Sequence, residues 1–530
     1  MTEFGTAVDA TLHRHINSTG AGAAVAVVQN GNVVHRQGYG LANIEKNSPM
    51  TPLSAFRICS VSKQFTCLLI RLLEYEGKLS VAHSPRRYLT ELPAFMDKIN
   101  IRQLCQNVSG MRDYWCLAML TGASAETRFR RADAERIINS QRTVQFLPGS
   151  AYSYCNGNFT VLGWLIEAVT GRSYPHELHT RVLGPLGMSD TFVPAATSEA
   201  LPGDIIGYEP APDGGVMPAK VDIHWEGDAG IVSTLDDLIH WEQNFDHNRV
   251  GPPGLIETLY ETPCFPSGIP SEYGFGLHLG RYRGFPYQSH EGGLRGWRMC
   301  RIRFPSEQLS VIAMFNFMAD AGDIARAVAD VFLPGERPAL QDLYRPETGD
   351  RALDYCGFYL DRATGKGYEL GLEDGIFTLN AMGQKFPLIR DGAASFVDRQ
   401  GLLRISFDPE VATPVAEFRS FGANYRARLS QERSDQAFAP DRYTGVFRSQ
   451  ELQSTITIER EGSGLQIKIG GPLGEVAGWP VRPVAQNIVM LECQRALDHR
   501  PPGEFALWFQ SKDELVVSCS LAFGVRFTRL

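Results

Sequence analysis

The chain has 530 residues, of which 43% are hydrophobic, and a formal net charge of −8 at pH 7. This length predicts about three domains, and the acidic balance argues against nucleic acid, because no basic stripe is available to neutralise phosphates. The sequence shows neither a secretory signal pattern nor an apolar run of transmembrane length. Ten cysteines are scattered without a C-x-x-C pair, so we expect reduced thiols, no metal site and a cytoplasmic protein that does not bind membranes.

The N-terminal elements begin with a β-hairpin. Apolar runs at 23–28 and 33–34 flank the dipeptide Asn30-Gly31, which is a typical hairpin turn. The apolar spacing over residues 65–73 then predicts a helix, and Gly77 is suited to end it.

Helical patterns continue from about residue 98 to 185 and include a helix that ends at Gly171. Beyond them the sequence predicts three strands and a last helix, at 273–279, 297–304, 309–315 and 324–331. We therefore predict an α+β domain over residues 1–333, in which an antiparallel sheet lies beside a helical region and the site occupies the crevice between them.

The last third of the chain has a different sequence pattern. A linker is expected at 333–338, followed by short strand patterns with frequent Gly and Asp turns. The segments 355–359 and 443–447 open two similar strand series, which favours two small antiparallel β-barrel domains, at 345–434 and 435–530. A single large sandwich is the alternative.

The most informative motif is Ser60-Val61-Ser62-Lys63, which reads S-x-x-K ahead of the predicted helix. A serine at a helix start and a lysine one turn later share a face, and the free N–H groups of the helix start suit a developing oxyanion. This arrangement predicts a serine that becomes acylated, with the lysine easing its deprotonation. A serine that only caps the helix is the alternative, and about one or two such matches are expected by chance.

Two further motifs follow in order, Tyr154-Cys155-Asn156 and His290-Glu291-Gly292. The ordered trio resembles the serine β-lactamase and penicillin-binding-protein superfamily. Within it, the segments 58–66 and 152–159, together with the C-terminal extension, are most similar to bacterial D-aminopeptidases. The resemblance implies a β-lactamase-like (transpeptidase) catalytic domain followed by two β-barrels.

The first two motifs supply the proton chemistry. Ser60 is the expected nucleophile, and Lys63 is expected to be enclosed, because burial lowers the pKa of a lysine toward the range that a base needs. The phenol of Tyr154 has an ordinary pKa of about 10, which a nearby Lys63 ammonium lowers. The sequence leaves open which of the two takes the serine proton, because they form a coupled pair. The amide of Asn156 suits Lys63 and a substrate amide.

The third motif replaces the lysine of K-T-G with a histidine. A neutral His290 holds a substrate carboxylate less well than a permanent cation, although Arg295 on the same segment could compensate; a purely structural histidine is the alternative. Gly292 and Gly293 would let the substrate approach a strand edge closely. The N–H groups of Gly293 and Ser60 are the predicted oxyanion hole.

A loop near the C-terminus separates an aminopeptidase from its relatives. Recognition of a free α-ammonium calls for a carboxylate beside an otherwise closed pocket. In the similar D-aminopeptidases, a loop of the last barrel reaches the active site and presents an aspartate to the substrate amine. The turn-rich loop 494–504 matches it, with Asp498 at the corresponding position; a solvent-facing aspartate is the alternative.

The resemblance thus implies a serine hydrolase that releases an N-terminal D-residue, D-alanine preferred, from small peptides, amides and esters. The resemblance implies an acyl-enzyme on Ser60 and no cofactor. A homodimer and the preference for D-residues over L-residues are suggested by the resemblance alone. The alternatives are a β-lactamase, a D,D-carboxypeptidase or an esterase of the same superfamily. From a different class, a sensor that is acylated without turnover also fits.

Overall fold

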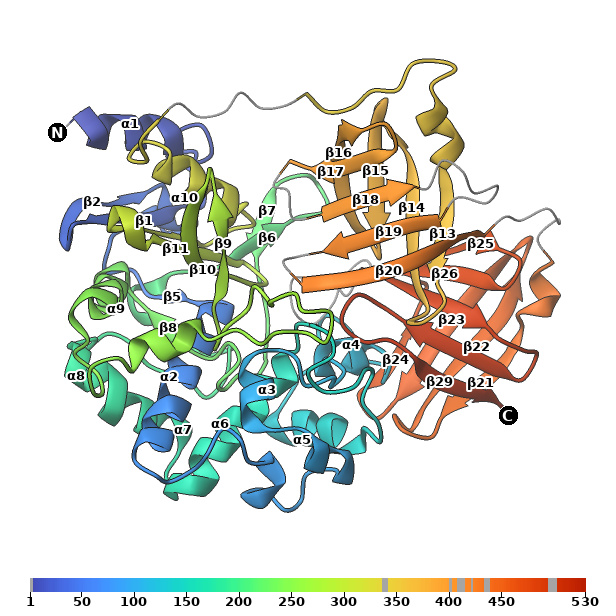
Figure 1. The fold of residues 1–530 in the computed structure, drawn as a ribbon, viewed down its shortest axis with the longest axis horizontal. Helices are drawn as coiled ribbons and strands as arrows, with labels where there is room; N and C mark the ends of the chain where they lie inside the picture. The colour runs from blue at the N-terminus through green and yellow to red at the C-terminus, as the bar shows by residue number, and fades with distance from the viewer. Residues whose placement is uncertain are drawn as a thin grey trace.

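A computed structural model describes residues 3–335, 342–399, 403–407, 415–420, 423–432, 439–493 and 503–530 (Figure 1). Part of the linker expected at 333–338 therefore lies outside the described residues. The same holds for residues 494–502 of the predicted active-site loop, including Asp498.

The N-terminal part is built on a six-stranded antiparallel sheet with the order β2-β1-β12-β11-β10-β9. Its strands are β1 (Ala23–Gln29), β2 (Asn32–Tyr39), β9 (His278–Tyr282), β10 (Phe285–Leu294), β11 (Trp297–Phe304) and β12 (Leu309–Phe315). The hairpin at Asn30-Gly31 and the strands at 297–304 and 309–315 are confirmed.

The strand predicted at 273–279 begins only at His278. The cause is Gly276, which adopts φ +71 and interrupts the extended chain. A Cβ atom there would lie 2.7 Å from the carbonyl oxygen of Lys63, so the chain passes directly beside the helix that follows Ser60.

The two faces of the sheet belong to different cores because side chains alternate along each strand. Val25 and Val27 pack with the helices α1 (Glu3–Leu12) and α10 (Ala321–Ala329). Ala24 and Ala26 belong to the core on the opposite face, which includes α2 (Ser62–Tyr75). Figure 1 shows α1 and α10 on one side of the sheet and α2 and α9 on the other.

The helical region lies on the α2 side. It comprises α3 (Ile101–Cys105), α4 (Tyr114–Met119), α5 (Arg131–Ser140), α6 (Asn156–Thr170), α7 (Tyr174–Leu178), α8 (Gly184–Leu186) and α9 (Leu235–His247). Short strand pairs accompany it: β3 (Leu41–Asn43) with β4 (Ser48–Pro49), β5 (Phe56–Arg57) with β8 (Val232–Ser233), and β6 (Tyr208–Pro210) with β7 (Val216–Pro218).

Helix ends follow the sequence signals. Gly77 follows α2 with φ +70, and Gly171 ends α6 with φ +69, as expected of glycine after a helix. None of the helices in the described part of the chain is both long and apolar enough to cross a bilayer.

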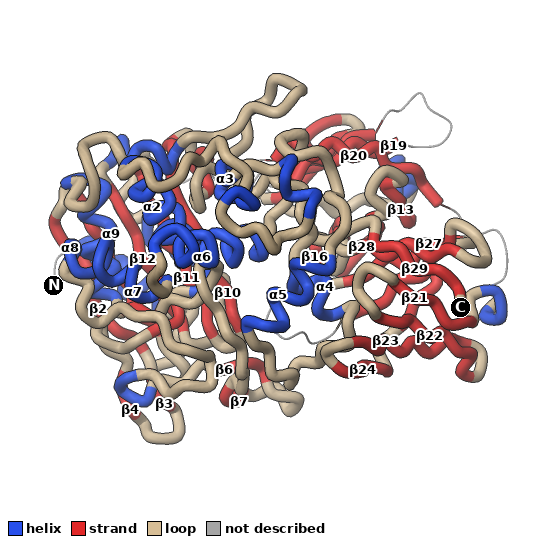
Figure 2. The backbone as a smooth tube through the Cα atoms, turned by 90° about the horizontal axis from the view of Figure 1, so that it is seen from below, coloured by secondary structure: helices blue, strands red, loops and turns tan. Residues whose placement is uncertain are grey.

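The regular secondary structure of the C-terminal part is mainly strand, joined by loops (Figure 2). The first β domain is a closed barrel of β13 (Gly357–Asp361), β14 (Lys366–Glu373), β15 (Ile376–Ala381), β16 (Gln384–Gly392), β17 (Ser395–Asp398), β18 (Leu403–Phe407), β19 (Val415–Ser420) and β20 (Ala423–Glu432). The second is a nine-stranded sheet with the order β24-β23-β22-β21-β29-β28-β27-β26-β25.

The strands of this second domain are β21 (Gly445–Ser449), β22 (Ser454–Glu461), β23 (Gly464–Gly471), β24 (Gly474–Ala477), β25 (Val481–Ala485), β26 (Ile488–Glu492), β27 (Glu504–Phe509), β28 (Glu514–Ser518) and β29 (Val525–Arg529). The prediction of two antiparallel β domains is confirmed. The second differs from a closed barrel because β24 and β25 share no ladder. Pro480 precedes β25 and Pro483 lies within it, and proline has no N–H to donate.

The second β domain packs against the helical region. The backbone N–H of Leu473 donates to the carbonyl of Thr121 at 3.0 Å, just after α4. A Cβ atom at Gly122 would lie 2.0 Å from the carbonyl oxygen of Gly474. The two parts of the chain therefore meet backbone to backbone.

Candidate active site

Ser60 lies in a single 3₁₀ turn, Cys59–Val61, that leads directly into α2. The residue before it, Cys59, has φ +53, a conformation that is uncommon for residues other than glycine. Strand β10 passes so close that a Cβ atom at Gly292 would lie 2.8 Å from the carbonyl oxygen of Ile58 and 3.1 Å from the nitrogen of Ser60. The turn therefore holds a half-buried serine against the sheet.

Lys63 is completely buried and connects three groups. Its ammonium donates to Ser60 Oγ at 3.0 Å, to Asn156 Oδ1 at 2.9 Å and to the carbonyl oxygen of Asp228 at 2.7 Å. Burial lowers the pKa of Lys63 to about 8, although the carboxylates of Asp228 and Asp113 oppose this effect. About a tenth of the lysine is thus a neutral amine at pH 7, and that amine can accept the proton of Ser60.

The orientation of Asn156 is fixed by Asp113. The backbone N–H and the side-chain Nδ2 of Asn156 both donate to Asp113 Oδ2, at 2.6 and 3.0 Å, which leaves Oδ1 for Lys63. Asp113 is buried and also caps α4 by accepting from the N–H of Trp115 at 3.0 Å. Burial raises the pKa of Asp113 to about 6, so at pH 7 it is ionised and accepts both hydrogen bonds.

Asp228 was not anticipated from the sequence. Its backbone carbonyl binds Lys63, and its carboxylate accepts hydrogen bonds from the Tyr114 hydroxyl at 2.7 Å and from the N–H of Glu226 at 3.2 Å. Asp113 was missed as well, and its one sequence signal is an aspartate at a helix start. Both residues support Lys63 from segments far away along the chain.

Tyr154 lies beside the lysine, and His290 lies beside Tyr154. Lys63 Nζ is 5.0 Å from the centre of the Tyr154 ring, which is within cation–π distance. The rings of Tyr154 and His290 have their centres 6.1 Å apart.

The hydrogen bonds of His290 determine its tautomer. Nδ1 lies 2.6 Å from the carbonyl oxygen of Glu291, and Nε2 lies 3.0 Å from the Tyr273 hydroxyl. A carbonyl can only accept, so Nδ1 carries the hydrogen and Nε2 accepts from Tyr273. Burial lowers the pKa of His290 well below its ordinary 6.5, so the ring is neutral at pH 7 and this position supplies no permanent cation.

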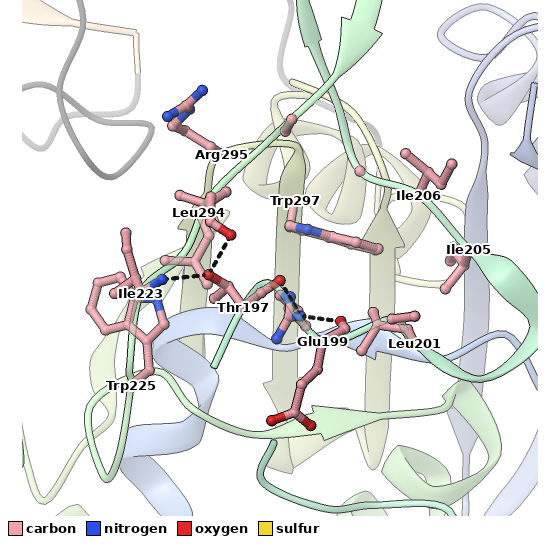
Figure 3. A pocket seen from close by; sticks show the side chains of 15 residues that line it. Thr197, Glu199, Leu201, Ile205, Ile206, Ile223, Trp225, Leu294, Arg295 and Trp297 are labelled. Atoms are coloured by element: carbon pink, nitrogen blue, oxygen red, sulfur yellow. Dashed lines mark hydrogen bonds between the residues drawn. The ribbon is translucent and has the colours of Figure 1, made fainter. Parts of the chain in front are cut away.

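A cavity of about 150 Å³ lies at the end of β10 (Figure 3). Leu294, Arg295 and Trp297 line it from the β10–β11 hairpin. Arg295 is buried, and its guanidinium donates to both carboxylate oxygens of Glu209, at 2.7 and 3.1 Å, and to the carbonyl of Ala125 at 2.6 Å. Its charge is therefore neutralised within the protein, and a substrate would have to share this ion pair.

The fold brings most of the sequence-predicted residues together. The residues that meet around the serine turn are Ser60, Lys63, Tyr154, Asn156, His290 and Gly292. Gly293 follows on β10, and a Cβ atom there would meet the guanidinium of Arg298 at 2.8 Å. Arg295 is among the residues that line the neighbouring cavity, with its guanidinium pointing away from the other labelled residues (Figure 3), and Asp498 lies outside the described residues.

The chemistry that this arrangement allows is acyl transfer. A serine hydroxyl lies within hydrogen-bond distance of a partly neutral amine, and the serine lies in the 3₁₀ turn that leads into α2. In the described residues, no three side chains of His, Cys, Asp or Glu gather in a way that could hold a metal ion.

Comparison with known proteins agrees with this chemistry. The family model for Beta-lactamase matches residues 12–332, and the model for D-aminopeptidase, domain B, matches residues 388–528. The chain therefore belongs to the beta-lactamase family. Two curated relatives are similar over nearly the whole length: a D-aminopeptidase of Brucella anthropi (36% identity, 100% of both chains) and a D-aminopeptidase of Gluconobacter oxydans (34% identity, 96% of both). Within the family, the chain is thus a member of the D-aminopeptidase group.

Solved structures share the fold at lower sequence identity. The octameric penicillin-binding protein homologue from Pyrococcus abyssi aligns with a TM-score of 0.58 and 19% identity, covering 81% of this chain and 100% of that chain. The D-amino acid amidase from Ochrobactrum anthropi SV3, in complex with D-phenylalanine, aligns with a TM-score of 0.53 and 21% identity, covering 62% of this chain and 99% of that chain.

Proposed function

We propose that the protein is a serine D-aminopeptidase that releases an N-terminal D-residue, preferably D-alanine, from small peptides, amides and esters. One observation carries the hydrolase chemistry: the buried amine of Lys63 bonds Ser60 Oγ, Asn156 Oδ1 and the carbonyl of Asp228 at once. The choice of a D-residue is supported by the full-length similarity to D-aminopeptidases.

The reaction starts with the neutral form of Lys63. As Ser60 Oγ attacks the substrate carbonyl, its proton passes to Lys63 Nζ and a tetrahedral oxyanion forms. The N–H groups of Ser60 and Gly293 are the proposed oxyanion donors. Removing one donor of this type typically lowers the reaction rate by ~10²–10³. When the C–N bond breaks, the leaving amine takes the proton, and the acyl group stays on Ser60.

Hydrolysis of the acyl-enzyme reverses these steps. A water molecule attacks the ester carbon and gives its proton to the same amine, and Ser60 Oγ leaves and recovers that proton. Tyr154 lies against Lys63, with Nζ 5.0 Å from its ring centre. We assign the base role to Lys63 because its contact with Ser60 Oγ is 3.0 Å.

The charges around the site favour a substrate amine over a substrate carboxylate. His290 is neutral, and Arg295 is paired with Glu209, so neither offers an unpaired positive charge. This argues against a D,D-carboxypeptidase. We propose that Asp498 in loop 494–504 binds the α-ammonium and that the loop restricts the enzyme to the terminal residue.

Location and assembly are also proposals. A cytoplasmic location is supported by the cysteines, since all ten are free thiols. A homodimer is supported only by the resemblance to D-aminopeptidases, and size-exclusion chromatography with light scattering would test it.

The decisive assay measures release of p-nitroaniline from the anilides of D-alanine, L-alanine and N-acetyl-D-alanine. Wild type, Ser60→Ala and Asp498→Ala are compared, with Asp513→Ala as a control for an exposed aspartate in the same β domain. We expect turnover of the free D-anilide alone, loss of activity in Ser60→Ala, a raised KM in Asp498→Ala, and no change in the control.

Other outcomes would redirect the assignment. Indifference to N-acetylation and to Asp498 would discard amine recognition and favour an esterase or carboxypeptidase. A single burst of product without continuing release would indicate an acylated sensor.

A further inference from the structure

The turn between β28 and β29 leaves its own sheet and enters the catalytic part of the molecule. We call residues 519–524 the docking turn. The carbonyl of Leu521 accepts from the backbone N–H of Asp113 at 3.2 Å, and the carbonyl of Phe523 accepts from Arg112 Nε at 3.0 Å. Figures 1 and 2 both show the C-terminal sheet beside α4 and α5. The turn therefore binds the two residues that lead into α4.

Gln145 joins the docking turn to the tyrosine motif. Its Oε1 accepts from the N–H of Phe523 at 3.1 Å, and its Nε2 lies 3.5 Å from the carbonyl of Leu521. The same Nε2 donates to Ser153 Oγ at 3.2 Å and to the carbonyl of Met111 at 3.1 Å. One side chain thus holds the docking turn, the segment before Asp113 and the residue before Tyr154.

Arg112 strengthens the same contact. It is buried, and besides Phe523 its guanidinium donates to the carbonyl of Thr143 at 2.9 Å and to Glu451 of the second β domain at 3.4 Å. The residue that follows is Asp113, whose carboxylate fixes both amide groups of Asn156. Asn156 in turn accepts from Lys63. An unbroken series of hydrogen bonds leads from the second β domain to the amine beside Ser60.

The docking turn is itself firmly held. Its backbone is closed by a 2.7 Å hydrogen bond from the N–H of Cys519 to the carbonyl of Ala522. Lys366 of the first barrel donates to the carbonyl of Ser520 at 2.8 Å, and its ammonium lies 4.6 Å from the centre of the buried Phe523 ring. The turn is therefore wedged between the first barrel and the helical region and can act as a fixed support.

We propose that the docking turn is a positioning element of the active site and that Gln145 is its main positioning residue. Through Gln145 and the Arg112–Asp113 peptide, the turn determines where Asn156 holds Lys63 relative to Ser60. The second β domain would then set the reactivity of the nucleophile through this turn, independently of loop 494–504. This inference rests on the proposed function only in taking Ser60 as the nucleophile.

The test measures the rate at which Ser60 is labelled by a neutral fluorophosphonate, as a function of pH. Gln145→Met keeps the length of the side chain and removes its hydrogen bonds. Gln106→Met is the matched control, because Gln106 is a buried glutamine whose amide bonds the carbonyl of Glu261 at 2.8 Å and does not contact the docking turn.

We expect Gln145→Met to lower the plateau rate at least tenfold. We also expect the rising limb of its pH–rate profile to move to lower pH, because Lys63 loses its acceptor Asn156 and the nearby charge of Asp113, and that charge raises the pKa of Lys63. Gln106→Met should stay within twofold of wild type. A third variant, Phe523→Ala, keeps the backbone N–H that bonds Gln145 but removes the ring that stacks on Phe146 and lies against Lys366. It should add less than threefold to Gln145→Met, because both substitutions loosen the same turn.

Several results would overturn the proposal. The first is a pH–rate profile whose limb stays at the wild-type pH in Gln145→Met. The second is a loss of labelling rate in Gln145→Met no larger than in Gln106→Met. The third is that the effects of Gln145→Met and Phe523→Ala on the labelling rate multiply fully. If Phe523→Ala fails to fold, the pair of glutamine variants decides alone, since thermal unfolding reports their stability separately. Labelling reads the reactivity of Ser60 and not peptide release, so a protein that labels normally but releases no D-alanine would refute the proposed function and leave this inference standing.

Discussion

The pKa of Lys63 predicts the pH dependence of the nucleophile. Burial brings this pKa from 10.5 to about 8, so the neutral fraction of the amine is about 1% at pH 6, about 10% at pH 7 and about half at pH 8. If the neutral amine takes the serine proton, the rate of Ser60 modification rises about tenfold per pH unit below 8 and levels off above 9. His290 adds no limb in this range because its pKa lies well below 6.5.

A neutral fluorophosphonate is the reagent for this measurement, because a substrate with a free amine would add its own titration. Below about pH 6 the fall should become steeper, since protonation of Asp113, whose pKa is about 6, loosens Asn156. Lys63→Met should lose at least ~10³ in rate, in the range of general base catalysis. Asp113→Asn should lose the steeper part and move the limb below pH 8, because the charge of Asp113 raises the pKa of Lys63. A rate that is flat between pH 7 and 9 would refute the neutral lysine as the base.

Two further predictions concern packing beside the site. Gly292→Ala should lower the labelling rate of Ser60 by roughly 10²-fold, as does the loss of an oxyanion donor, because the new Cβ would displace the serine turn. The control is Gly371→Ala, on a strand where nothing lies within 4 Å of the Cβ position, and it should leave the rate unchanged. Equal effects of the two substitutions would contradict the predicted clash. Glu242→Gln removes the carboxylate that pairs with Arg301, whose side chain is only 1% exposed. It should lower the free energy of unfolding, measured with urea, by about 3–5 kcal/mol, because the guanidinium stays buried and charged without its ion-pair partner. A loss below about 1 kcal/mol would show that water reaches this pair.

The site residues that could be found from the sequence are those that lie close together in the chain. Ser60 and Lys63 are one helical turn apart, so their proximity follows from helix geometry alone, and the apolar residues after Lys63 indicated its burial. The hairpin at Asn30-Gly31 and the helix ends at Gly77 and Gly171 were likewise predicted correctly, because each depends on a turn or cap that glycine or asparagine provides.

The supporting residues could not be found in this way. Asp113 meets Asn156 across 43 positions, and Tyr114 meets Asp228 across 114, so nothing in their local sequence distinguishes them from ordinary capping or core residues. The strand predicted at 273–279 failed for a similar reason. Gly276 is bent to fit beside Lys63, and that contact belongs to the tertiary structure.

His290 of the third motif and Arg295 on the same segment suggest how specificity is divided in this molecule. A site that binds a substrate carboxylate needs a cation beside Ser60, yet His290 is held neutral by burial and by the bonds to Glu291 and Tyr273. Arg295 is bound to Glu209. Neither His290 nor Arg295 therefore supplies an unpaired positive charge for a substrate carboxylate. Under the proposed function, recognition of the amine falls to loop 494–504 of the C-terminal part, whose docking turn also accepts a hydrogen bond from the backbone N–H of Asp113. On this argument, the β domains matter for both binding and rate, and exchanging them between relatives should alter KM and kcat together.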